Sequence, residues 1–206
     1  MIDCGNDWST GATKLAPDAI LLTHAHPDHA AGLKNGAPCP VFATTETWKI
    51  LKRYRIADRR LIAPDRPFSI GRTSFEAVPV EHSLRAPAVG YLIRQLESSC
   101  VFYVPDVAAI PGGNRVLSAA RIYIGDGAAV RRPILRKRGN VLIGHAPMAS
   151  QLKWCHDAGV PRAIFTHCGS QIVAGDEETA MLELHRLGLH YGIDVRLAYD
   201  GLVIVV

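Results

Sequence analysis

The chain lacks long apolar runs and cysteine motifs. None of its hydrophobic segments reaches the roughly 18 to 20 residues that a membrane-spanning helix needs, and the first residues, MIDCGNDW, do not form a secretory signal. The five cysteines are odd in number and include no C-x-x-C pair, so neither a disulfide framework nor a cysteine zinc site is expected. We therefore expect a cytoplasmic protein with no membrane partner.

A large excess of one charge is also missing. The formal net charge of the 206 residues is +4, which is too small to indicate nucleic acid as a partner. Basic residues are densest in RRPILRKRG, at residues 131–139, which is either a solvated loop or a rim that attracts anions. We expect a small anionic substrate, and the sequence is compatible with a homodimer.

Short apolar runs alternate with amphipathic stretches, which favours a layered α/β fold. No linker divides the chain, so residues 1–206 are expected to form one domain. The expected strands are 18–23, 40–44, 67–70, 73–80, 121–126 and 162–167, and the expected helices are 45–54, 147–159 and 176–192. We also expect a hairpin over 88–106 that turns at Glu97, Ser98 and Ser99, and a C-terminal hairpin around Asp200 and Gly201.

Metal-ligand side chains are concentrated in HAHPDH, residues 24–29. In an extended segment His24 and His26 point to the same side, and Pro27 then forces a turn. The turn lets Asp28 and His29 approach from another direction, so these residues can serve two neighbouring metal ions. Imidazole and carboxylate ligands suit zinc, manganese or iron. The competing interpretation is a group of polar residues on an exposed loop.

Three further ligand candidates follow apolar runs elsewhere in the chain. His82 ends AVPVEH, Asp106 ends VFYVPD and His167 ends AIFTH. In α/β folds, functional groups commonly lie on the loops at strand ends. These residues are therefore expected to join the HAHPDH segment in one site.

The motifs IDCG, THAHPDH, EHS, YVPD and FTHCG, in this order, resemble those of the metallo-β-lactamase superfamily over essentially the whole chain. The resemblance implies an α/β fold, the four-layer αββα sandwich, with a binuclear site at one edge. The usual N-terminal strands would be missing, which would leave a sheet edge for a partner to cover. By the same resemblance, one ion is held by His24, His26 and His82, the other by Asp28, His29 and His167, and Asp106 bridges the two.

The form EHS…VGY, followed by DG, GH and TH, is most similar to the phosphodiesterase branch of that superfamily. That branch includes the tRNA 3′-processing endonuclease, whose tRNA-gripping arm has no counterpart here, and a cyclic-phosphate phosphodiesterase. The resemblance implies that His145, in LIGHAPM, stabilises the phosphorane or protonates the leaving oxygen. The alternative is a helix-start residue bonded to the backbone.

Together with Asp28, His145 is a predicted catalytic residue. Asp3, in IDCG, resembles a position of the superfamily that supports the site from behind the ligands. Asp126 could orient a ligand histidine in the same way, or simply form a turn with Gly125 and Gly127. Two cations of zinc or manganese, with iron as a third choice, would activate water for hydrolysis. The expected activity is cleavage of a phosphodiester, such as a cyclic phosphate or a nucleotide-like substrate. A thioester, lactone or other carbonyl-ester hydrolase and a non-catalytic metal-binding accessory protein are the alternatives.

Overall fold

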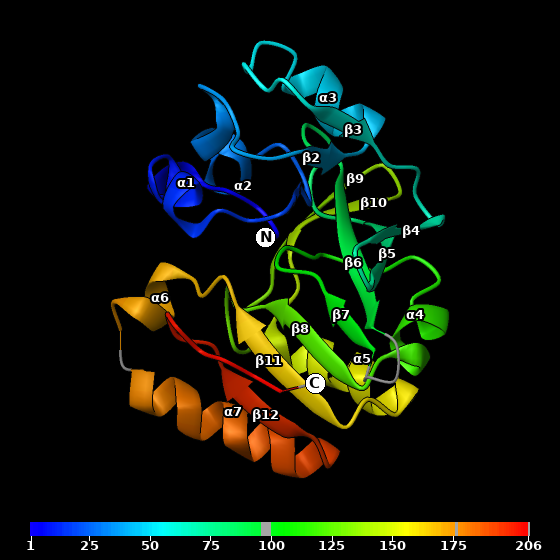
Figure 1. The fold of residues 1–206 in the computed structure, drawn as a ribbon. Coiled ribbons are helices and arrows are strands. Elements are labelled where there is room, and N and C mark those ends of the chain that lie inside the picture. The colour runs from blue at the N-terminus through cyan, green and yellow to red at the C-terminus, as the bar shows by residue number, and fades with distance from the viewer. Residues whose placement is uncertain (96–99, 176, 206) are drawn as a thin grey trace.

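The fold combines a small sheet, a large sheet and a two-stranded ribbon (Figure 1). The computed structural model describes residues 1–95, 100–175 and 177–205. The N-terminal third builds the small sheet with its helices, and the rest of the chain builds the large sheet. The α/β class expected from the alternating pattern is confirmed.

The small sheet has three parallel strands in the order β1-β2-β3. They are β1 (Ile20–Leu21), β2 (Val41–Ala43) and β3 (Arg59–Leu61). The first two lie inside segments that were predicted as strands. The third was not predicted, because all of its residues are exposed and two are arginines, so it has no apolar pattern.

The large sheet has seven strands in the order β12-β11-β8-β7-β6-β5-β4. Its bounds are β4 (Pro67–Ile70), β5 (Thr73–Val80), β6 (Ala88–Gln95), β7 (Val101–Tyr103), β8 (Ile122–Asp126), β11 (Arg162–Thr166) and β12 (Asp194–Leu197). Strands β4 to β7 pair antiparallel, whereas β7, β8, β11 and β12 pair parallel. The parallel strands therefore end at one edge, where their following loops meet.

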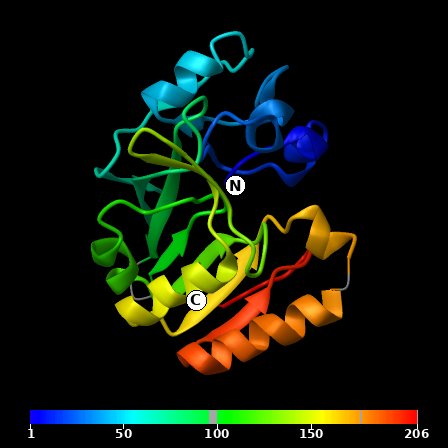
Figure 2. The ribbon, with the colours of Figure 1, turned by 180° about the vertical axis from the view of Figure 1, so that it is seen from behind.

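Helices cover the outer sides of both sheets (Figure 2). They are α1 (Gly11–Leu15), α2 (Pro27–Ala30), α3 (Thr45–Ile50), α4 (Asn114–Ala119), α5 (Met148–Ala158), α6 (Ser170–Val173) and α7 (Glu177–Tyr191), with 3₁₀ turns at Asn6–Trp8 and Ala31–Leu33. Helix α5 ends at Gly159 with a φ of 76°, as its sequence predicts. None of the described helices is both long and apolar enough to span a bilayer.

Buried apolar side chains join these elements into layers. Leu21 of β1 and Tyr91 of β6 belong to a cluster between the two sheets. Leu22 and Leu51 belong to a cluster between the small sheet and its helices. Leu152 of α5 belongs to the largest cluster, which joins the large sheet to α4, α5 and α7. The order helix, sheet, sheet, helix is the four-layer arrangement that the motifs imply.

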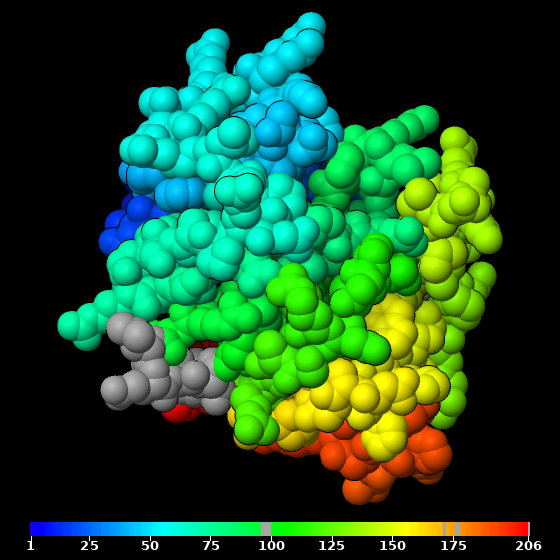
Figure 3. All heavy atoms as spheres, turned by 90° about the vertical axis from the view of Figure 1, so that its right-hand side faces the viewer, coloured from blue at the N-terminus to red at the C-terminus, as the bar shows by residue number. Residues whose placement is uncertain are grey.

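The basic segment is not a loop. Residues Ile134–Arg138 form β9, which pairs antiparallel with β10 (Val141–His145). Figure 3 shows this ribbon, in yellow-green, along one side of the molecule. The strand was not predicted from the sequence, because an exposed two-stranded ribbon needs no apolar face and so leaves no alternating apolar pattern.

The two expected hairpins have different outcomes. Strands β6 and β7 pair antiparallel as predicted, and the expected turn at Glu97, Ser98 and Ser99 lies outside the described residues. The C-terminal hairpin is wrong. Strand β12 pairs parallel with β11, and residues 198–205 form no strand. Instead, Leu202 and Ile204 pack on the large sheet beside Ile122 and Ile164.

Tyr91 ties the large sheet to the segment that leads into HAHPDH. Its side chain is fully buried, and its hydroxyl donates a hydrogen bond to the Leu22 carbonyl at 2.7 Å. Two residues earlier on the same strand, the Val89 amide donates to the Thr23 carbonyl at 3.0 Å. Strand β6 thereby holds the two residues that precede His24.

Replacement Tyr91→Phe should lower the free energy of unfolding by about 1–3 kcal/mol, because it leaves the buried Leu22 carbonyl without its donor. Urea unfolding measures the change. Tyr199→Phe is the matched control, because Tyr199 is 69% exposed, and it should change stability by less than about 0.5 kcal/mol. Equal effects of the two substitutions would contradict the role of the Tyr91 hydroxyl.

Candidate metal centre

The HAHPDH segment adopts the conformation expected from its sequence. His26 is extended, with φ −65° and ψ 150°, and precedes α2, which begins at Pro27. Proline suits this first helical position because it has no amide hydrogen to leave unpaired. Asp28 and His29 then project from the first turn of α2, so they approach the centre from a different side than His24.

The ring nitrogens of three histidines form a first group. Two of the histidines belong to the HAHPDH segment, and the third, His82, follows β5. His26 Nδ1 lies 2.9 Å from His24 Nε2 and 3.3 Å from His82 Nε2. The other nitrogen of His82, Nδ1, lies 3.1 Å from the Gly144 carbonyl oxygen and donates to it. This bond leaves the lone pair of His82 Nε2 directed at the other two rings.

A second group forms beside the first. His167 Nε2 lies 3.2 Å from Asp28 Oδ2, and His29 Nε2 lies 3.5 Å from the same oxygen. His167 follows β11 directly and has a φ of 54°, a left-handed conformation that turns the chain at the strand end. Asp28 and His167 are partly exposed, whereas His29 is buried.

Asp106 lies between the two groups. Its Oδ2 is 3.7 Å from His24 Nε2 and 2.7 Å from His29 Nε2. Its Oδ1 is 3.4 Å from His167 Nδ1. The structure thus brings together the seven predicted ligand residues, which come from four separate parts of the chain: His24, His26, Asp28, His29, His82, Asp106 and His167.

The imidazoles of the first group favour the neutral form. Burial, and after it the charge of nearby His29, lower the pKa of His24 to about 2. Burial also lowers the pKa of His26 and of His82. Neutral imidazole is the form that binds a metal ion, so this environment suits ligation.

His29 and Asp106 have the opposite electrostatic environment. Burial lowers the pKa of His29, but the carboxylates of Asp106 and Asp3 outweigh it and raise the pKa to about 10. Burial raises the pKa of Asp106, but the adjacent His29 and then His167 hold it below its usual range. The carboxylate therefore attracts positive charge into the buried centre.

Two polar atoms at this point favour a metal ion over internal hydrogen bonds. Among the described residues, buried His29 Nε2 and Asp106 Oδ2 have no hydrogen-bond partner. They are close enough for an ion pair, yet the contact lacks the alignment of a hydrogen bond. Buried acceptors in this condition are costly unless a cation satisfies them. The nitrogen-rich set of ligands fits zinc, manganese or iron.

Asp3 supports this centre from the side away from the ligand atoms. Its Oδ2 accepts from His29 Nδ1 at 2.7 Å and from the Thr23 hydroxyl at 2.8 Å. Its Oδ1 accepts from the Thr23 amide at 2.7 Å. These contacts place Asp3 behind His29, on the side away from the other predicted ligand atoms. Thr23 was missed, although it stands directly before His24 in LLTHAH.

Asp126 supports His145 and not a ligand histidine. Its Oδ2 lies 2.8 Å from His145 Nδ1 and accepts from the Val107 amide at 2.9 Å. Its Oδ1 accepts from the Ala128 amide at 2.9 Å, so the fully buried carboxylate is held on several sides. The carboxylate therefore holds His145, which is not among the seven predicted ligand residues. The turn interpretation is incomplete, because the side chain reaches His145.

His145 does not begin a helix, because it is the last residue of β10. Its ring centre lies 5.0 Å from that of His82 and 6.4 Å from that of His167. Burial lowers the pKa of His145, but the hydrogen bond and charge of Asp126 outweigh it and raise the pKa. The ring therefore faces both groups with a proton-bearing Nδ1 fixed on Asp126.

Gln151 is a supporting residue that the sequence interpretation missed. It is fully buried on α5, and its Oε1 accepts from the Asp126 amide at 3.0 Å. Its Nε2 donates to the Asp126 and Ala146 carbonyls at 2.8 and 2.7 Å. The sequence feature that could have identified Gln151 is its position as a polar residue on the apolar side of an amphipathic helix.

The position before His145 requires a glycine, Gly144. Its φ is 110°, and a Cβ at this position would clash with the Ile134 carbonyl oxygen of β9. Its amide donates to the His82 carbonyl at 2.8 Å, and its own carbonyl accepts from the His82 ring. The glycine thus lets β10 pass close enough to position both histidines.

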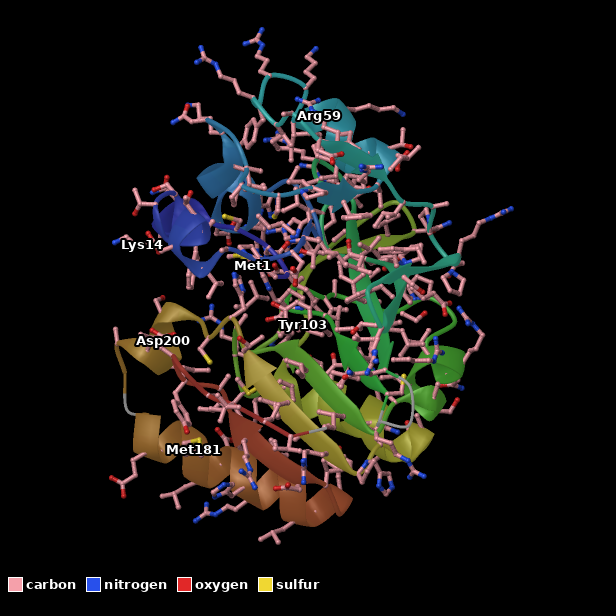
Figure 4. The ribbon with its side chains drawn as sticks, in the orientation of Figure 1. Met1, Lys14, Arg59, Tyr103, Met181 and Asp200 are labelled. Atoms are coloured by element: carbon pink, nitrogen blue, oxygen red, sulfur yellow. The ribbon has the colours of Figure 1, made fainter. Side chains whose placement is uncertain are left out.

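Two pockets open beside His167. One, of about 370 Å³, includes Asp28, His29 and Tyr103 in its lining. The other, of about 400 Å³, is bounded by α6 and by the segment with Asp200. Figure 4 labels Tyr103, which lines the first pocket, and Asp200, which lines the second. A small molecule can therefore reach the side chains of Asp28 and His167 from solvent.

Comparisons with known proteins agree with this geometry. The model of the β-lactamase superfamily domain family matches residues 1–168. A solved diphosphatase of the PhnP family is 20% identical, with a TM-score of 0.67 over 98% of this chain and 76% of that one. YhfI of Bacillus subtilis, a metallo-β-lactamase fold protein, is 16% identical, with a TM-score of 0.73 over 98% and 84%.

A third solved structure with the same fold has a different reported activity. The isothiocyanate hydrolase from Delia radicum gut bacteria is 15% identical, with a TM-score of 0.68 over 93% of this chain and 77% of that one. No curated protein matches the chain by sequence. At these identities the structures establish the fold.

Substitution Asp3→Asn should weaken binding of a divalent metal ion by about 10–100-fold, because an amide stabilises the donating His29 ring less than a carboxylate does. Competition against a chromogenic chelator measures the affinity. Asp7→Asn, an exposed neighbour, is the matched control and should bind metal as the wild type does. Unchanged affinity in the Asp3 variant would remove Asp3 from the support of the centre.

Proposed function

The chain belongs to the metallo-β-lactamase superfamily of hydrolases, and from this premise we propose that it hydrolyses phosphodiesters with two divalent metal ions. The proposed substrates are small and anionic, such as cyclic phosphates or nucleotide-like diesters. The similar structures do not indicate which type of bond this protein hydrolyses, since one is a diphosphatase and another an isothiocyanate hydrolase. The choice rests on the residues around the centre.

The proposed ligand sets follow the two groups of side chains. His24, His26 and His82 would hold one ion, Asp28, His29 and His167 would hold the other, and Asp106 lies where its carboxylate could serve either. Zinc and manganese are the proposed metals, and iron also fits this mixture of imidazole and carboxylate. When bound, the pair of ions supplies an activated water and neutralises charge on the phosphoryl group.

The observation that carries the phosphodiester proposal is the pair His145 and Asp126. Cleavage of a diester leaves an alkoxide oxygen that needs a proton. The carboxylate of Asp126 holds the His145 ring by Nδ1 and raises its pKa, which keeps the proton-bearing form available near neutral pH. We assign His145 as the proton donor to the leaving oxygen.

Asp28 is the second catalytic residue of the proposal. Its carboxylate is 58% exposed, in contrast to the buried Asp106, and it lines the pocket of about 370 Å³. It therefore stands where substrate enters while its Oδ2 faces His29 and His167. This position lets Asp28 orient the attacking water as well as bind an ion.

Metal-stripped protein should not hydrolyse bis(p-nitrophenyl) phosphate, and reloading with zinc or manganese should restore turnover. Release of p-nitrophenol measures the rate, and p-nitrophenyl acetate tests a carbonyl ester on the same samples. Metal-dependent turnover of the acetate without turnover of the diester would replace the phosphodiester proposal with an esterase. A protein that binds two ions and turns over neither probe would be an accessory protein.

Substitution His145→Ala should lower kcat by about 10²–10⁴-fold, the range of general-acid contributions, for a diester with an alkoxide leaving group, such as a nucleoside 2′,3′-cyclic phosphate. Metal content, measured by atomic absorption, should stay at the wild-type value, because the first and second groups do not need the ring. His185→Ala on α7, an exposed histidine, is the control and should retain activity. Loss of metal together with activity would show that His145 is a ligand.

A further inference from the structure

One face of the ribbon carries His145 together with two arginines. Facing residues of an antiparallel pair project to the same side, and His145 faces Ile134 while Ile143 faces Arg136. Side chains alternate along a strand, so Arg138 shares this face and Lys137 projects from the other. Two residues of strand span roughly 7 Å, so the arginines lie on the order of 10 Å beyond His145.

These arginines line a pocket next to the metal centre. Its volume is about 280 Å³. The lining comes from the three residues that follow His82 and from the ribbon: Ser83, Leu84, Arg85, Arg136, Arg138 and Ile143. The ribbon and the His82 loop are joined by the two hydrogen bonds between Gly144 and His82. We call this cavity the arginine pocket.

The guanidinium groups of the arginine pocket have no acidic partner in the described part of the chain. No ion pair there includes Arg85, Arg136 or Arg138, whereas Arg131, a few residues before β9, pairs with Glu183. The three arginines are exposed, so an anion can reach them. Like charges around one cavity repel each other, and a bound anion would relieve this repulsion.

The chemistry of guanidinium favours phosphate as that anion. Arginine donates paired N–H groups in a planar fork that matches two phosphate oxygens, and such charge-assisted bonds are stronger than neutral ones. The serine hydroxyl and apolar lining leave room for a sugar beside the phosphate. A cavity of about 280 Å³ suits one such group and not an extended nucleic-acid strand.

We propose that the arginine pocket binds a second phosphate group of the substrate, at Arg85, Arg136 and Arg138, while the scissile diester lies at the metal centre. This inference rests on the proposed phosphodiesterase function and narrows its substrate class. The preferred substrate is a small phosphodiester that carries a phosphate monoester on the order of 10 Å from the scissile phosphorus. The pocket selects the substrate and takes no part in the bond cleavage.

Two chromogenic probes with the same leaving group test the proposal. They are thymidine 5′-(p-nitrophenyl phosphate) and the same diester with a 3′-phosphate. The metal-loaded wild type should show a higher kcat/KM for the 3′-phosphorylated probe, with the gain in KM. In the double variant R136A/R138A this preference should fall about tenfold or more, the loss expected for charge-assisted phosphate bonds.

Lys137→Ala is the matched control, because it removes one positive charge from the same strand but from the opposite face. It should keep the wild-type preference. An equal loss in this variant would mean that general charge attraction, not the pocket, selects the substrate. A wild type with no preference between the probes, but with metal-dependent turnover of both, would overturn the pocket proposal and leave the proposed function intact.

Binding separates the two proposals if neither probe is hydrolysed. Calorimetry with thymidine 3′,5′-bisphosphate, which has no diester to cleave, should give a Kd about tenfold higher in the arginine double variant than in Lys137→Ala. An equal Kd in both variants would overturn the pocket. A Kd that falls further with each nucleotide added to a thymidine oligomer would assign the surface to nucleic acid instead.

Discussion

The structure depends on one electrostatic constraint, the buried Asp106 carboxylate placed between two groups of histidine nitrogens. Its Oδ2 faces His24 on one side and His29 on the other, and the carboxylate is buried. Burial of a carboxylate is costly unless positive charge compensates it. A site that accepts this cost is built for cations, and the neighbouring neutral imidazoles provide the other lone pairs that cations need.

The surrounding architecture keeps those lone pairs aimed at one place. Each supporting bond uses the part of a histidine that faces away from the centre: Asp3 holds His29, the Gly144 carbonyl holds His82, and Asp126 holds His145. These supports come from the N-terminal segment, the ribbon and the large sheet. Tyr91 fixes the two sheets to each other directly before the HAHPDH segment begins. The three bonds thus set the ring directions of His29, His82 and His145.

The exposure and the charge of the side chains in the site change with distance from its buried centre. The ligand carboxylate of Asp106 is inaccessible, whereas Asp28 and His167 are open to the pockets on either side. His145 lies at the start of the ribbon, and the unpaired arginines lie farther along the same face. Charge therefore changes along the proposed substrate path from a negative centre that attracts metal to a positive pocket that attracts phosphate.

The seven candidate ligand positions could be proposed from the sequence because metal ligation depends on residue type and on strand ends, and both are visible locally in HAHPDH, EHS, YVPD and FTH. The layered fold followed from the same alternation of apolar runs. The sequence could not show that residues 134–138 pair as a strand, that Asp126 holds His145 and not a ligand, or that Gln151 holds Asp126. Those contacts join residues from 19 to 25 positions apart or lie on an exposed ribbon without an apolar pattern. Only the packing of distant segments decides which polar groups meet, because a hydrogen bond depends on atomic position and not on residue type alone.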